Sequence, residues 1–243
     1  MSRTFAIGDI HGALKALQQL LHRISPEVND HFIFLGDYVD GWPQSAEVIQ
    51  FLMDFSNRYK CVFVKGNHDT DCEEWLINGM PKKDWLFHGG QMTMDGYGKF
   101  SEEQRKQHLE FFNRMHDYYV DEDNRLFIHA GFSSMYGPVH EHYGNNYKWD
   151  RTLWEMALTM DKRVKKHPKL YPKRLLLFKE IYIGHTPTLN YDVEVPMNGC
   201  NVWNVDTGAA FYGKLSAINI DSKEIFQSDT VMSLYPGEKG RNH

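Results

Sequence analysis

The stretch TFAIGDIHG (residues 4–12) is a short apolar run that ends in a glycine and two potential metal ligands, Asp9 and His11. An apolar run of four residues next to glycine is typical of a buried strand. Glycine at a strand end lets the backbone turn sharply and come close to an ion or a phosphate. The stretch therefore predicts a buried strand followed by a ligand-binding loop.

The same pattern recurs further along the chain, in GDYVDG (36–41), GNHD (66–69), HAG (129–131) and GHT (184–186). Between the first three motifs, leucines at helix spacing predict a helix over 13–23, and a second helix is expected over 43–57 with Pro43 in its first turn. The order strand (4–7), helix, strand (31–35), helix, strand (61–64) predicts parallel pairing with right-handed crossovers. Since open α/β sheets bind ligands at the carboxyl ends of their strands, we expect all five loops to converge in one crevice.

The remainder of the chain alternates in the same way. Ser101 and Gln104 are spaced as a capping box and predict a helix over 101–115, and another helix is expected over 152–160. Further strands are expected over 125–128, 180–183, 202–205, 215–220 and 224–227. We find no repeat and no linker, so residues 1–235 are expected to form a single domain, followed by a polar segment, 236–243, that we expect to fray.

Composition narrows the class of protein. With 42% hydrophobic residues in 243, the chain can bury one sizeable core, and its net charge of −5 argues against a general nucleic-acid surface. Apolar runs are far too short for a membrane span. The three cysteines are widely spaced and odd in number, which excludes a disulfide framework. We therefore expect a cytoplasmic protein, while the sequence leaves its oligomeric state open.

The side chains in the five loops are ligand types for transition metals. Carboxylates, imidazoles and one amide oxygen suit Mn²⁺, Fe or Zn²⁺ better than Ca²⁺. Six ligands are too many for one catalytic zinc with an open position, so we expect two divalent ions that share a carboxylate. Mn²⁺ is the preferred ion, with Fe or Zn²⁺ as alternatives. The candidate ligands are Asp9, His11, Asp37, Asn67, His129 and His185.

In these motifs, and in DTGA at 206–209, the sequence resembles the calcineurin-like metallophosphoesterases. Within them it is similar to the phosphoprotein-phosphatase branch and its compact bacterial serine/threonine phosphatases. The resemblance covers residues 8–209 and implies an α/β fold, a four-layer α/β/β/α sandwich with two mixed β-sheets.

The resemblance also implies individual roles. Asp9 and His11 would hold the first metal, Asp37 would bridge, and the second metal would be held by Asn67, His129 and His185. His68 resembles the general acid of the family, with Asp40 fixing its imidazole. The implied nucleophile is a metal-bridging hydroxide, so no Ser or Cys nucleophile is needed.

The sequence departs from the branch at Gly41, where an Arg that grips the phosphate usually follows the Asp. Arg151 resembles the second phosphate-gripping Arg of the family, and a surface salt bridge is the alternative. Trp42 is expected to cover the site, to stack on a nucleobase or an aromatic phosphoester, or simply to pack against the following helix. The basic stretch 162–174 either recruits a polyanion or is a solvated loop.

We therefore predict a metal-dependent phosphoric ester hydrolase that acts on phosphomonoesters, either phospho-Ser/Thr of proteins or small phosphoesters. The alternative is a nucleotide phosphoanhydride hydrolase that acts on dinucleoside polyphosphates. A non-catalytic metal-binding module is a third interpretation, but the chain keeps all six candidate ligands together with His68 and Asp40.

Overall fold

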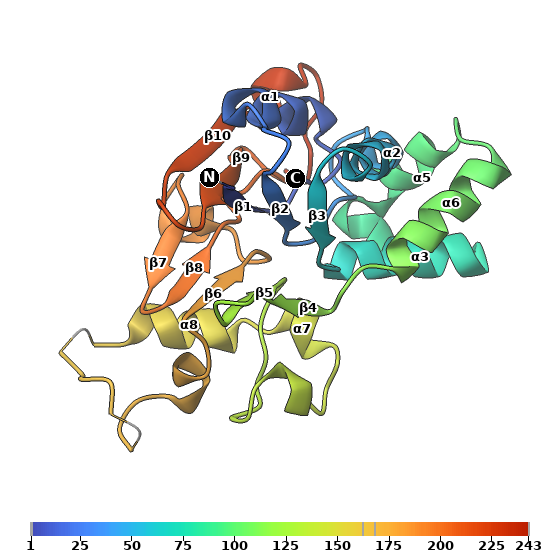
Figure 1. Cartoon of the computed structure of the whole chain (residues 1–243). Coiled ribbons are helices and arrows are strands. Elements are labelled where there is room, and N and C mark those ends of the chain that lie inside the picture. The colour runs from blue at the N-terminus through green and yellow to red at the C-terminus, as the bar shows by residue number, and fades with distance from the viewer. Residues whose placement is uncertain (1, 162, 168, 243) are drawn as a thin grey trace.

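A computed structural model describes residues 2–161, 163–167 and 169–242, and its centre is a pair of mixed five-stranded β-sheets (Figure 1). The first sheet has the order β10-β9-β1-β2-β3, and the second has the order β4-β5-β6-β8-β7. The strands of the first are β1 (Thr4–Ile7), β2 (His31–Phe34), β3 (Lys60–Phe63), β9 (Lys214–Asn219) and β10 (Ile225–Thr230). Those of the second are β4 (Tyr118–Val120), β5 (Arg125–Ile128), β6 (Glu180–Ile183), β7 (Met197–Gly199) and β8 (Val202–Asn204).

Strand pairing follows the predicted pattern in the first half of the chain. β1, β2 and β3 pair in parallel, with Phe5 opposite Phe32 and Phe32 opposite Cys61. β5, β6 and β8 are also parallel, while β9 and the edge strands β4, β7 and β10 run antiparallel to their neighbours. The carboxyl ends of the parallel strands therefore gather at one end of the two sheets.

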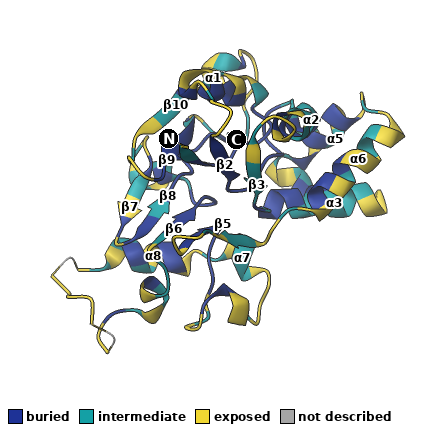
Figure 2. Ribbon diagram, in the orientation of Figure 1, coloured by how far each residue is buried: buried dark blue, intermediate teal, exposed yellow. Residues whose placement is uncertain are grey.

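Alternating side chains on the strands create three apolar layers. Phe5 and Ile7 of β1 pack under α1 (Leu14–Ile24) and α2 (Ser45–Ser56), while Ala6 between them faces the second sheet. Phe127 and Tyr182 lie in the same middle layer, and α8 (Thr152–Thr159) covers the far side of the second sheet (Figure 2). This arrangement confirms the predicted four-layer sandwich.

The helices differ from the predictions mainly in α2 and in the region after β3. α6 (Glu102–Asn113) is capped by Ser101 and Gln104 as predicted, but α2 begins at Ser45, so Pro43 precedes its first turn. The sequence missed α3 (Asn67–Asn78), whose residues are mostly polar and lack a clear apolar repeat. It also missed the helical run that follows, α4 (Lys83–Trp85), η1 (Leu86–Gly90) and α5 (Gln91–Tyr97). The remaining short helices are η2 (Pro138–His140), α7 (Asn146–Trp149), η3 (Lys173–Leu176), η4 (Thr188–Tyr191) and α9 (Val231–Leu234).

Trp42 does not cover the site. Its indole is fully buried, stacks on the Tyr235 ring at 5.2 Å and donates a hydrogen bond to the carbonyl of Ala209. A buried ring cannot stack on a nucleobase, so the packing alternative is correct, although its main partner is Tyr235.

The expectation that the final segment frays is wrong for residues 236–242. The backbone N–H of Arg241 donates to the carbonyl of Ala210, and the backbone of Gly240 lies against the Trp42 indole. The segment is therefore fixed to the body of the protein by packing and backbone hydrogen bonds.

In the basic stretch 162–174, Lys162 lies outside the described residues, Arg163 pairs with Asp161, and Arg174 donates to the carbonyl of Phe132. Cys61, Cys72 and Cys200 are free thiols in the structure. Across the described part of the chain, no helix combines the length and the apolar character that crossing a bilayer requires.

Candidate active site

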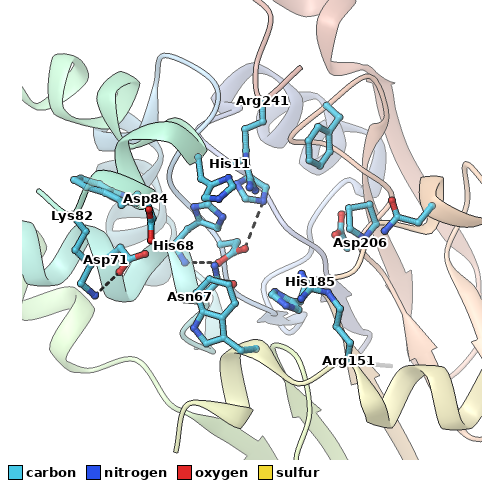
Figure 3. Close-up of a pocket in the computed structure, with 17 residues that line it drawn as sticks. His11, Asn67, His68, Asp71, Lys82, Asp84, Arg151, His185, Asp206 and Arg241 are labelled. Carbon is cyan, nitrogen blue, oxygen red and sulfur yellow. Dashed lines mark hydrogen bonds and ion pairs between the residues drawn. The ribbon is translucent and has the colours of Figure 1, made fainter. Parts of the chain in front are cut away.

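The loops at the carboxyl ends of the parallel strands meet in a pocket of about 490 Å³ (Figure 3). It is lined by predicted site residues from the loops after β1, β2, β3 and β6, and by Asp206 from the loop after β8. His129, from the loop after β5, lies fully buried beneath them. The six predicted metal ligands are thus brought to one place, as the pattern of strand ends predicts.

The backbone of these loops is strained where the site residues lie. Four non-glycine residues have a positive φ, namely His11 (52°), Asp37 (52°), Asp40 (72°) and His185 (67°). Such conformations cost free energy and persist only when the surroundings impose them. Buried Asp69 supplies part of that constraint, because its carboxylate accepts hydrogen bonds at 2.8 Å from the backbone N–H groups of Asp37, Tyr38 and Gly66.

Two buried groups of His and Asp side chains have the spacing of metal sites, and both contain Asp37. One consists of His11, Asp37 and His68, and the other of Asp37, His129 and His185. Oδ2 of Asp37 lies 3.6 Å from Nε2 of His11 and 3.4 Å from Nε2 of His129. A carboxylate between two imidazole groups is the arrangement expected of a dinuclear site.

The side-chain atoms that remain without partners fit bound cations. Oδ1 of Asp9 and Nε2 of His185 are buried and have no hydrogen-bond partner among the described residues. Burying such atoms unpaired is costly, and a metal ion removes that cost. Asn67 Oδ1 lies 3.2 Å from Nε2 of His129, so it also faces the second group. The donor set suits two divalent ions but does not by itself identify the metal.

Burial and neighbouring charges set the protonation of these groups. Burial and the charges of Asp206 and Asp37 raise the pKa of Asp9 well above its ordinary value. Burial also opposes ionisation of Asp37, but the positive charges of His129 and His68 overcome it and hold its pKa well below the ordinary range. Burial lowers the pKa of His11 and of His185, which favours the neutral, metal-binding form of each imidazole.

His68, a member of the first group, forms a buried pair with Asp40. Nδ1 of His68 lies 2.6 Å from Oδ2 of Asp40, so the proton on Nδ1 is held by the carboxylate and Nε2 is the ring nitrogen left for other partners. The Asp40 carboxylate also accepts hydrogen bonds from two residues that the sequence did not suggest. Nε1 of Trp85 and the hydroxyl of Thr93 each donate to it at 2.6 Å. Both come from the helical region after α3, which the sequence did not predict.

Cationic and aromatic side chains line the rim of the pocket. Arg151 lies on the His185 side, where its charge helps to lower the pKa of that imidazole, and its guanidinium forms no ion pair or hydrogen bond with another described residue. This excludes the salt-bridge alternative for Arg151 within the described chain. Lys82, in contrast, is neutralised by Asp71 and Glu74. The half-exposed ring of Trp149 meets the His185 ring edge-on at 5.8 Å.

Two mixed sheets sandwiched by helices, with paired His and Asp metal groups at their strand ends, define a metal-dependent phosphoesterase. The family model for calcineurin-like phosphoesterases matches residues 2–208, and the chain belongs to that family. It is a metal-dependent hydrolase of phosphoesters.

Relatives named for an enzymatic activity match nearly the whole chain. The bis(5'-nucleosyl)-tetraphosphatase PrpE [asymmetrical] of Anoxybacillus flavithermus is 28% identical, with 97% of each chain covered. The protein of the same name from Bacillus cereus is 26% identical over 95% of each. A serine/threonine phosphatase from Saccharomyces cerevisiae has a similar structure, with a TM-score of 0.63 at 13% identity, and the match covers 100% of this chain and 84% of that one. That structural likeness supports the fold alone.

Proposed function

We propose that this protein hydrolyses dinucleoside tetraphosphates, cleaving them asymmetrically into a nucleoside triphosphate and a nucleoside monophosphate. The full-length relatives named for this activity support the alternative from the sequence more than its main interpretation, which favoured phosphomonoesters. The observation that carries the proposal is the open aromatic surface of Trp149 beside the two metal groups.

A dinucleoside tetraphosphate has two bases joined by a highly charged chain, so a site for it needs a stacking surface next to phosphate-binding groups. Trp149 is 49% exposed, lines the pocket and contacts His185. Stacking of one base on an aromatic side chain contributes about 1–3 kcal/mol. Trp149 would therefore perform the base stacking that was one of the alternatives for Trp42, because the Trp42 ring is buried.

The polar residues have distinct proposed roles in the reaction. Asp9, His11, Asp37, Asn67, His129 and His185 would hold the two divalent ions. When bound, such ions activate water and neutralise charge on the phosphoryl oxygens. Arg151 would bind non-bridging phosphate oxygens with its free guanidinium. His68, with its Nδ1 proton held by Asp40, would donate a proton from Nε2 to the leaving oxygen.

The test offers Mn²⁺-loaded protein diadenosine tetraphosphate and a phosphoserine peptide in parallel. We expect AMP and ATP in equal amounts from the dinucleotide, with the peptide left intact. The Asn67→Ala variant serves as the control for contaminating phosphatase. Inorganic phosphate from the peptide, with the dinucleotide intact, would overturn the proposal in favour of a monoesterase, and ADP as the sole product would contradict asymmetric cleavage.

A second measurement tests the stacking surface. Trp149→Leu removes the ring but keeps an apolar side chain at the rim, and we expect its KM for the dinucleotide to rise about fivefold or more because base stacking is lost. KM for p-nitrophenyl phosphate, which is far smaller than a dinucleotide, should change much less. Equal changes for both substrates would count against a base-binding role for Trp149.

A further inference from the structure

Gly41 lies at the position where related phosphatases carry an arginine that binds phosphate. Gly41 has a φ of +111°, and a Cβ atom built on it would lie 3.1 Å from Cγ and 3.5 Å from Cδ of Arg241. The space where a side chain at position 41 would begin is thus filled by the side chain of Arg241. The two residues are 200 positions apart in the sequence.

Several contacts hold Arg241 at this position. Its backbone N–H donates to the carbonyl of Ala210 at 2.9 Å, and the preceding Gly240 packs on the indole of Trp42. Trp42 is itself fixed by stacking on Tyr235 and by its hydrogen bond to Ala209. Trp42, which directly follows Gly41, therefore anchors the segment that carries Arg241.

The guanidinium of Arg241 is available for a ligand. It lies over the ring of Phe211, 5.4 Å from the centroid, and it forms no ion pair or hydrogen bond with the rest of the described chain. Arg241 lines the same pocket as His11, and Figure 3 shows it above the metal groups, on the opposite side from Arg151. Its positive charge helps to lower the pKa of His11. Burial raises the pKa of Asp206, and the charge of Arg241 opposes that increase.

We propose that Arg241 supplies the phosphate-binding guanidinium that is absent at Gly41, so that Arg241 and Arg151 bind the phosphate chain of the substrate from two sides of the metal groups. This proposal rests on the proposed function, because the ligand it names is the polyphosphate chain of a dinucleoside tetraphosphate. The chemistry fits, because a guanidinium forms strong paired hydrogen bonds with phosphate oxygens.

The test measures the affinity for inorganic phosphate by equilibrium dialysis of radiolabelled phosphate against Mn²⁺-loaded protein. We expect Arg241→Ala to raise the Kd for phosphate by about tenfold or more, since a charge-assisted interaction is lost. Arg241→Met keeps an apolar stem on Phe211 and should weaken binding as much, while Arg241→Lys should recover part of it. Lys239→Ala removes the same charge from an exposed position in the same segment, and its Kd should stay within about twofold of the wild type.

Two further readouts separate phosphate binding from a structural role. Metal content and Tm of Arg241→Met should equal those of the wild type, and KM for diadenosine tetraphosphate should rise more than kcat falls. An unchanged Kd in Arg241→Ala and Arg241→Met would overturn the inference, and so would an equal loss in Lys239→Ala. Because the dialysis needs no turnover, a wild type that leaves the dinucleotide intact would refute only the proposed substrate.

Discussion

Oδ2 of Asp40 lies 2.6 Å from Nδ1 of His68 and also 2.6 Å from Nε1 of Trp85. One fully buried carboxylate oxygen thus accepts from both the imidazole and the indole, while its other oxygen accepts from Thr93. Asp40 has a positive φ, so the backbone is strained to place this carboxylate behind His68. The pair depends on α4 and α5 as much as on the strand-end loops.

If His68 protonates the leaving oxygen, replacing His68 should lower kcat most for substrates with basic leaving groups. We expect His68→Asn to lower kcat for an alkyl phosphate such as glycerol phosphate by about 10²- to 10⁴-fold. The decrease in kcat for p-nitrophenyl phosphate should be at least about tenfold smaller than that for the alkyl phosphate, because its leaving group needs no proton. Steady-state kinetics on both substrates checks this, and equal losses would contradict the acid role.

The hydrogen bond from Trp85 should matter through Asp40. Trp85→Phe deletes the N–H group but keeps an aromatic ring against Trp75, whose ring lies 5.8 Å away. We expect kcat to fall by about tenfold with KM nearly unchanged, since one buried charge-assisted hydrogen bond is lost.

Trp75→Phe is the matched control for Trp85, because the Trp75 indole forms no hydrogen bond with other described residues. Its kcat should stay within about twofold of the wild type. A loss in Trp75→Phe as large as in Trp85→Phe would show that packing, and not the hydrogen bond, supports the site.

Removal of the shared carboxylate should disrupt both metal groups. In Asp37→Asn we expect the metal content, measured by plasma mass spectrometry after dialysis, to fall below that of the wild type, and kcat to fall by at least about a hundredfold. Asn67→Ala should behave similarly but lose metal chiefly from the second group, because its amide oxygen faces His129. Undiminished turnover in either variant would refute the assignment of the ligands.

The structure changes the outcome expected for an arginine at position 41. From the sequence alone, Gly41→Arg would restore phosphate binding and lower KM. In the structure, an arginine there would have to adopt a positive φ and would press against the side chain of Arg241, which would have to shift. We therefore expect no decrease in KM and a loss of about 1–2 kcal/mol in the free energy of unfolding. Urea denaturation and steady-state kinetics of this variant check both, and a lower KM in otherwise wild-type protein would contradict the placement of Arg241.

His108 links stability to pH away from the active site. Its imidazole is fully buried between Tyr97 and Gln50, and burial lowers its pKa to about 4. The unfolded chain takes up the proton at a higher pH than the folded protein does, so stability is complete above pH ~6.5 and is lost as the pH falls toward 4. The free energy of unfolding should drop by roughly 1–2 kcal/mol from this group between pH 7.5 and pH 5.

Urea denaturation of wild type and His108→Gln at both pH values isolates this contribution. Glutamine has no titrating ring, so the decrease in stability between pH 7.5 and pH 5 should be smaller in the variant by that amount. An identical decrease in both proteins would show that His108 does not contribute.

Local patterns were sufficient to predict most of the strands and the convergence of the candidate metal ligands. Apolar runs ending in glycine and ligand residues predicted β1, β2, β3, β5 and β6, and the carboxyl ends of parallel strands must share one edge. The six candidate ligands could therefore be placed together without coordinates. Local patterns did not predict α3, because its residues are mostly polar and show no apolar repeat at helix spacing. They also did not predict β4 and β7, which are edge strands of only three residues.

The sequence by itself thus determined the alternation of strands and helices and the candidate metal ligands, because each depends on residues that are close together in one strand and its loop. The four-layer fold followed only from the resemblance of these motifs to a known family. Only the tertiary structure decided which side chains donate hydrogen bonds to Asp40, and only it placed the Arg241 side chain beside Gly41. Trp85 lies 45 residues from Asp40, and no local pattern connects them. Likewise, nothing near Gly41 predicts that a side chain from the segment after α9 fills its space, because that contact is created by the packing of Trp42 against Tyr235 and Gly240.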